Sequence, residues 1–201
     1  MHVSEGVLSA PVLITGALLT ALGTAIGLKK LTYEKIPEVA VLSSAFFVAS
    51  LIHVPIGPSS VHLILNGLVG VLLGWIAFPS ILIALALQAL LFQFGGITVL
   101  GVNTFNIAMP AVVVYYITAP LIRKDSQKML ALGGFLSGII AVGLSALFVA
   151  LSLVSTGEFF ISAAKAILIA HLPIMPIEGI INAFCLLFLK KVKPELLGGN
   201  L

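Results

Sequence analysis

The sequence predicts an all-α protein, a single polytopic bundle of helices embedded in a membrane. Hydrophobic residues make up 60% of the 201 residues and charged residues only 8%, whereas roughly a quarter of residues are charged in soluble domains. The mean hydropathy is +1.25. The apolar residues also fall into runs near the roughly 17 to 25 residues that a membrane-spanning helix needs. We therefore expect residues 1–201 to form one membrane-embedded domain.

Glycine, proline and charged residues divide the apolar runs into seven predicted spans. They lie near residues 7–28, 39–54, 62–78, 80–94, 103–122, 129–154 and 161–189. The first has no basic segment before it and is predicted to be a retained span rather than a cleaved signal. The second, third and fourth are short for ~30 Å of hydrocarbon, so we expect their ends to lie against other helices. Pro173 and Pro176 interrupt the last.

The basic residues predict the orientation of these spans. Nine of the ten Lys and Arg residues fall in the first connection, the fifth connection and the C-terminal tail: Lys29, Lys30, Lys35, Arg123, Lys124, Lys128, Lys190, Lys191 and Lys193. With seven spans and an outside N-terminus, all nine are cytoplasmic, as the positive-inside rule requires. The C-terminus is then cytoplasmic too. The net charge of +3 calls for no nucleic-acid partner.

The start of the chain, Met1-His2, is the main indication of function. The α-amino nitrogen, the His2 amide nitrogen and the His2 imidazole can close a five-membered and then a six-membered chelate ring around one cation. Nitrogen donors in a square plane favour nickel(II) or copper(II). We therefore interpret residues 1–6 as a metal-binding segment. On Met1 and His2 alone, chance occurrence of His after the initiator Met is the alternative.

The predicted topology brings several polar residues to the same outer side. His62 is the preferred fourth nitrogen donor, because it follows a segment at 57–61 that can turn back into the protein. His53 is expected at a helix end, and His171 and Glu178 two turns apart on one face of the last span. Glu178 is interpreted as a structural acceptor rather than a metal ligand. Residues expected to support the site or cover it are Glu5, His53, Gln93, Gly95, Gly96, Asn103, Asn106, His171 and Glu178.

The glycine-rich segment before Asn103 is expected to close over this site, and the alternative, an ordinary re-entrant or turn segment, is compatible with that role. Asn103, Asn106, Gln93 or Glu178 is expected to hold the far nitrogen of a ligating imidazole and so fix its tautomer. Each donor must lose a proton to bind, so metal binding should weaken in acid.

Enzyme activity has little support in the sequence. No Walker pattern for ATP hydrolysis and no His-Glu-x-x-His metalloprotease motif occurs in the 201 residues. Two other classes remain as alternatives. One is a proton-coupled secondary metal transporter that uses Glu178 and His171, although no repeated half is evident. The other is a structural membrane subunit that binds no metal.

Four motifs, in this order along the chain, resemble one known family. They are Met-His-Val-Ser-Glu-Gly at 1–6, Gly-Pro-Ser-Ser-Val-His at 57–62, the glycine-rich segment at 90–98 with Leu-Gly-Val-Asn-Thr-Phe-Asn at 100–106, and Ala-His-Leu-Pro at 170–173 with Glu-Gly at 178–179. The family is NikM/CbiM, the membrane substrate-binding component of energy-coupling-factor nickel and cobalt transporters. The resemblance covers nearly the whole chain.

The resemblance implies that the metal is held by the Met1 amine, the amide and imidazole of His2, and the imidazole of His62. It also implies a transmembrane coupling component, two cytoplasmic ATPases and a prokaryotic cell membrane. The two-span companion fused to some members is not seen here, so we expect any such partner to be a separate chain. The planar nitrogen clamp favours Ni²⁺ as the transported ion, with Co²⁺ as the alternative.

Overall fold

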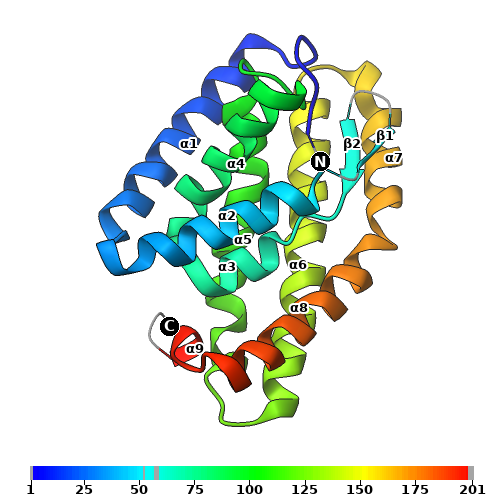
Figure 1. The fold of residues 1–201 in the computed structure, drawn as a ribbon. Helices are drawn as coiled ribbons and strands as arrows, with labels where there is room; N and C mark the ends of the chain where they lie inside the picture. The colour runs from blue at the N-terminus through cyan, green and yellow to red at the C-terminus, as the bar shows by residue number, and fades with distance from the viewer. Residues whose placement is uncertain (1, 52, 57–58, 199–201) are drawn as a thin grey trace.

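The computed structural model describes residues 2–51, 53–56 and 59–198, and in these ranges the chain is mainly helical with one short β-hairpin (Figure 1). The elements are α1 (Ala10–Lys30), η1 (Tyr33–Lys35), α2 (Ile36–Ala49), β1 (His53–Ile56), β2 (Ser59–His62), α3 (Asn66–Leu73), η2 (Gly74–Ile76), α4 (Ala77–Phe92), α5 (Leu100–Ile122), α6 (Gln127–Val154), η3 (Glu158–Phe160), α7 (Ile161–His171), α8 (Ile174–Val192) and α9 (Glu195–Gly198). The η elements are single 3₁₀ turns.

Four helical stretches are long and apolar enough to cross a membrane: α1, the continuous stretch from Asn66 to Phe92, α5 and α6. A fifth is formed by the pair Glu158–His171 and Ile174–Val192, which is bent by 41° at the break between them. This composition agrees with the predicted class, a helical membrane bundle. The count of seven spans and their orientation stay predictions, because α2 has 14 residues and α3 only eight.

The largest correction concerns the predicted spans at 39–54 and 62–78. Helix α2 ends at Ala49, and the chain then forms an antiparallel hairpin in which His53 pairs with His62. These two histidines were expected at helix ends, and that expectation was wrong. The next helix starts only at Asn66, after Leu65 adopts a left-handed backbone conformation with φ of 53°. Short hairpins with alternating polar residues give a weak signal beside long apolar helices.

Close packing of small residues holds the bundle together. Helix α6 packs against α5 and α8. A Cβ atom added at Gly134 of α6 would lie 2.7 Å from the Cα of Ala183 on α8. Polar side chains reinforce these contacts: the buried Asn66 amide donates to the Ile107 carbonyl at 3.0 Å and to the Ser145 hydroxyl at 2.9 Å. Such contacts are typical of helices that associate within lipid.

The arrangement separates the molecule into two ends (Figure 1). At the upper end in this view lie the N-terminal segment, the segment that leads into α5 and the connection between α6 and α7. The turn between α5 and α6 and the C-terminal helix α9 lie at the lower end. The hairpin lies beside α7, which packs against both strands. The N-terminal segment and His62 are therefore brought together from opposite ends of the first 62 residues.

Candidate metal centre

The imidazole rings of His2 and His62 lie against each other inside the protein. Their centroids are 4.8 Å apart and their planes differ by 20°. The exposed fractions of the two residues are only 5% and 3%. The structure thus brings together two of the three residues predicted to bind metal. The third, Met1, lies outside the described residues.

Asn103 holds the N-terminal segment in place through two hydrogen bonds to the backbone of Val3. The Val3 amide donates to Asn103 Oδ1 at 2.9 Å, and Asn103 Nδ2 donates to the Val3 carbonyl at 3.1 Å. Val3 itself is fully buried. Because Val3 follows His2 directly, this pair of bonds fixes the backbone next to the predicted chelating atoms. Asn103 therefore binds backbone, and its expected role in orienting a histidine ring stays a prediction.

The glycine-rich segment packs directly on the N-terminal segment. The Glu5 amide donates to the Gly95 carbonyl at 2.9 Å, and the Thr98 amide donates to the Glu5 carboxylate at 3.2 Å. Gly95 and Gly96 have φ values of 77° and 136°, which side chains with a Cβ rarely adopt. A Cβ atom added at Gly96 would also collide with the Glu5 side chain. Glu5, Gly95 and Gly96 thus shape the cover over the start of the chain.

The ring of His62 is held by its own backbone. Its Nδ1 lies 2.7 Å from the Leu63 carbonyl oxygen, which requires a proton on Nδ1. The Nε2 atom is buried and has no hydrogen-bond partner among the described residues. Burial is the main cause that holds the pKa of His62 well below its usual range, and the charges of His2 and His171 act in the same direction. The ring is therefore neutral near pH 7 and carries a lone pair on Nε2.

Glu178 fixes the turn that follows His62. Its carboxylate accepts hydrogen bonds from the backbone amides of Ile64 and Leu65, the latter at 3.0 Å to each oxygen. Glu178 is fully buried on α8. These contacts agree with the interpretation of Glu178 as a structural acceptor. The Nδ1 of His62 is bound to the Leu63 carbonyl, so the expectation that Glu178 holds an imidazole stays a prediction.

His171 repeats the hydrogen-bonding pattern of His62 on another element. It is the last residue of α7 and is fully buried. Its Nδ1 lies 2.7 Å from the Ile167 carbonyl oxygen, and its Nε2 has no hydrogen-bond partner within the described part of the chain. The prediction that His171 and Glu178 share one helix face was wrong, because the break after His171 puts Glu178 on α8.

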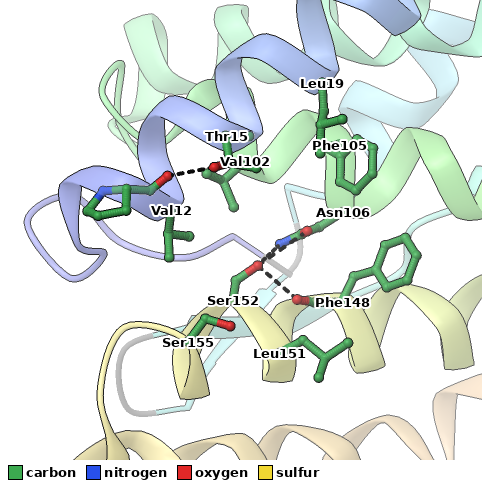
Figure 2. Close-up of a pocket in the computed structure, with 12 residues that line it drawn as sticks. Val12, Thr15, Leu19, Val102, Phe105, Asn106, Phe148, Leu151, Ser152 and Ser155 are labelled. Atoms are coloured by element: carbon green, nitrogen blue, oxygen red, sulfur yellow. Dashed lines mark hydrogen bonds between the residues drawn. The ribbon is translucent and has the colours of Figure 1, made fainter.

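Three further candidates lie outside this cluster. Gln93 is exposed and ends α4 in a left-handed conformation with φ of 57°. Asn106 donates to the Ser152 hydroxyl at 3.1 Å and lines a cavity of about 480 Å³ between α1, α5 and α6 (Figure 2). Asn106 thus joins α5 to α6, and its expected role in orienting a histidine stays a prediction. The backbone of His53 pairs with that of His62, and its side chain is outside the described set.

Among the described residues, no group of three or more His, Cys, Asp or Glu side chains is arranged to hold a metal ion. The predicted site is of a different kind, because two of its four nitrogens belong to the backbone at the start of the chain. Sequence reasoning missed the backbone atoms that hold these side chains. The carbonyls of Leu63 and Ile167 hold the two histidines, and backbone amides after His62 bind Glu178. Backbone groups carry no residue-specific signal, so only the fold reveals them.

The fold and the buried histidines define a helical membrane protein with a polar cluster at its N-terminal end. Residues 2–196 match the family described as "Cobalt uptake substrate-specific transmembrane region", and the chain belongs to this family. This finding confirms the resemblance to NikM/CbiM transport proteins. The chain is therefore a membrane protein of a cobalt and nickel transport family.

Similar proteins agree with this assignment. The chain is 42% identical to the "Putative metal transport protein" of Haemophilus influenzae, over 98% of this chain and 97% of that protein. It is 30% identical to the fused nickel transport protein NikMN of Rhodobacter capsulatus, over 98% of this chain and 64% of that protein. A crystal structure of a transition metal transporter superposes with a TM-score of 0.74 at 26% identity, covering 96% of this chain and 93% of that one. These names are those of transport proteins, in agreement with the prediction that the chain is no enzyme.

Proposed function

We propose that the chain is the substrate-binding membrane subunit of an ATP-driven transition-metal importer of the energy-coupling-factor type. It captures Ni²⁺ as its cargo through the Met1 amine, the amide and imidazole of His2, and Nε2 of His62. The observation that carries this proposal is the buried contact between the His2 and His62 rings, at 4.8 Å between centroids. Neutral imidazoles are common ligands of transition metals.

The separation of the two rings supports a shared ion. An imidazole nitrogen binds a transition metal at about 2 Å, which puts each ring centroid about 3 Å from the ion. Two rings at adjacent corners of a square then have centroids roughly 4 to 4.5 Å apart. The 4.8 Å between the rings of His2 and His62 is close to this value. A small movement of the rings therefore suffices to bring both to one ion.

The hydrogen bonds around the cluster support the same assignment. The Nδ1 of His62 is bound to the Leu63 carbonyl at 2.7 Å, which leaves Nε2 as the donor atom for the metal. Asn103 fixes Val3, and Glu178 fixes the turn after His62, so both halves of the site are positioned before metal arrives. Glu5, Gly95 and Gly96 then serve as the cover over the bound ion.

The proposed orientation places the N-terminus outside and the C-terminus in the cytoplasm of a prokaryotic cell. The two ends of the bundle support this, because the basic turn between α5 and α6 and the C-terminal helix lie away from the N-terminal segment (Figure 1). The proposal keeps a count of seven crossings, with α2 as one of them and with the stretch from Asn66 to Phe92 counted as two. A separate transmembrane coupling component and two ATPases supply the work, and a small companion subunit is a further candidate partner.

Nickel is the proposed cargo because a planar set of four nitrogens favours it over cobalt. Co²⁺ is the alternative, favoured by the description of the family as cobalt uptake proteins. A deprotonated amide among four nitrogen donors splits the nickel d levels enough to pair the electrons. Bound Ni²⁺ should therefore be diamagnetic and yellow, and the colour should fade in acid as the donors take up protons.

Titration of the purified chain with Ni²⁺ tests the proposal directly. The native N-terminus is compared with a variant that carries Gly-Ser-Gly-Gly ahead of Met1, which displaces the amine and leaves His2 too far from the new amine to join it in one planar set of donors. The native protein should bind one Ni²⁺ with the planar absorption band, and the extended variant should lose the band and at least ~10-fold in affinity. An extended variant that binds as the native chain does would refute the clamp. An octahedral nickel spectrum in the native protein would do the same.

A further inference from the structure

We infer that His171 and His62 form a second, inner metal position that receives the ion as it leaves the N-terminal clamp. The inference rests on the proposed function, since it concerns the same cargo and the same His62. It assigns His171 a direct role as a metal ligand, whereas the sequence indicated only a supporting role. Ions at this position would be held by two imidazoles, and water would fill the remaining positions.

The first observation in support of an inner metal position concerns the buried imidazole of His171. His171 is fully buried, yet its Nε2 has no hydrogen-bond partner among the described residues. Leaving a buried polar atom unsatisfied costs about 1–3 kcal/mol. Its Nδ1 is bound to the Ile167 carbonyl at 2.7 Å, so the proton is on Nδ1 and the lone pair is on Nε2. This is the form of histidine that binds transition metals.

The second observation is that the imidazole of His62 has the same hydrogen-bonding pattern as that of His171. His62 also binds a backbone carbonyl through Nδ1 and also leaves a buried Nε2 without a partner. Helix α7, which ends at His171, packs against both strands of the hairpin that carries His62. Two buried neutral imidazoles from separate elements thus carry their proton on Nδ1 and a lone pair on Nε2. A bound cation would satisfy both Nε2 atoms at once.

The position of His171 in the fold indicates that an ion reaches the inner position after it leaves the N-terminal clamp. Helix α7 runs from the end of the molecule that holds the N-terminal segment and stops at His171, where the bent break to α8 begins (Figure 1). His171 therefore marks the inner end of that helix. The described side chains do not form a preassembled group of three metal ligands. This favours a pair of positions that share His62 over one site that holds all three histidines together.

Ni²⁺ titration of a protein whose N-terminal clamp is blocked measures binding at the inner position alone. The variant with Gly-Ser-Gly-Gly ahead of Met1 keeps His62 and His171, and Ni²⁺ titration should show one weak, paramagnetic site. His171→Gln keeps a donor for the Ile167 carbonyl but supplies a poor metal ligand. In the extended protein it should lower the remaining affinity at least ~10-fold. In the native protein it should leave Ni²⁺ affinity and the planar band unchanged within about twofold.

Cysteine at the same position supplies a signature that a structural role cannot give. Thiolates bind transition metals strongly, so His171→Cys in the extended protein should strengthen Co²⁺ binding and show a thiolate-to-metal absorption band. The unsubstituted extended protein is the matched control, because it already contains Cys185. Gln88→Leu controls for loss of a buried polar side chain elsewhere, since Gln88 binds the Phe47 carbonyl between α2 and α4.

The outcomes distinguish the inner position from the clamp itself. The inference is overturned if the extended protein binds no Ni²⁺, if His171→Gln leaves its weak binding unchanged, or if the thiolate band is missing in His171→Cys. Extended protein that binds Ni²⁺ as tightly as native protein would instead refute the proposed function. Loss of affinity in the native protein on His171→Gln would also overturn the inference, by showing that His171 belongs to the first site.

Discussion

The two ends of this molecule treat polar side chains in opposite ways. At the N-terminal end, His62, His171 and Glu178 are buried, and backbone groups hold each of them. At the other end, Lys190 and Asp125 form an ion pair of 2.7 Å with exposed side-chain fractions of 31% and 99%. Removing a partner from a buried polar group costs far more than breaking an exposed ion pair. We therefore expect substitutions to change function at the first end and hardly at the second.

The largest effect is expected at His62. His62→Ala should lower Ni²⁺ affinity at least ~10-fold, because water replaces the fourth nitrogen and even losses around a metal site cost 10- to 100-fold. His53→Ala should cost less, although His53 pairs with His62 in the hairpin. Equilibrium titration of the purified proteins measures both. Equal losses at the two positions would show that the fourth donor is assigned wrongly.

Glu178 is expected to have the next largest effect, through the position of His62. Glu178→Ala leaves two buried amides without an acceptor, at about 1–3 kcal/mol for each unsatisfied group. Affinity for Ni²⁺ and thermal stability should both fall, and Glu178→Gln, which keeps one carbonyl acceptor, should fall less. The planar absorption band of bound Ni²⁺ should survive in Glu178→Gln. Its loss there would mean that the carboxylate itself binds the metal.

The sequence predicted the long apolar helices better than the contacts between distant segments. The long apolar runs predicted α1, α5 and α6 closely, because hydropathy decides where a helix can lie in lipid. The motifs at residues 1–6 and 57–62 identified His2 and His62, which the structure brings together. The hairpin and the break after His171 were missed, since they depend on packing between distant segments. The role of Asn103 was missed for the same reason.

Asn103 should have a moderate effect, because it holds backbone rather than metal. Asn103→Leu removes both hydrogen bonds to Val3, worth about 1 kcal/mol each. The N-terminal segment then loses part of its preorganisation, and Ni²⁺ affinity should fall roughly 5- to 30-fold with the planar band retained. Asn106→Leu is the matched control, since it removes an amide of the same helix that binds Ser152. Equal losses in the two variants would mean that helix packing, rather than the Val3 contact, is responsible.

The smallest effect is expected at the exposed ion pair. The hydrogen bond and charge of Lys190 hold the pKa of Asp125 below its usual range. The pair therefore stabilises the fold above the unfolded pKa of Asp, and this contribution is lost as pH falls through the lower pKa of the folded protein. Asp125→Asn should leave Ni²⁺ affinity unchanged and alter thermal unfolding only slightly at neutral pH, with the difference shrinking in high salt because salt screens exposed charges. A fall in Ni²⁺ affinity as large as that of Asn103→Leu would show that the two ends are coupled during binding, and the contrast between them would fail.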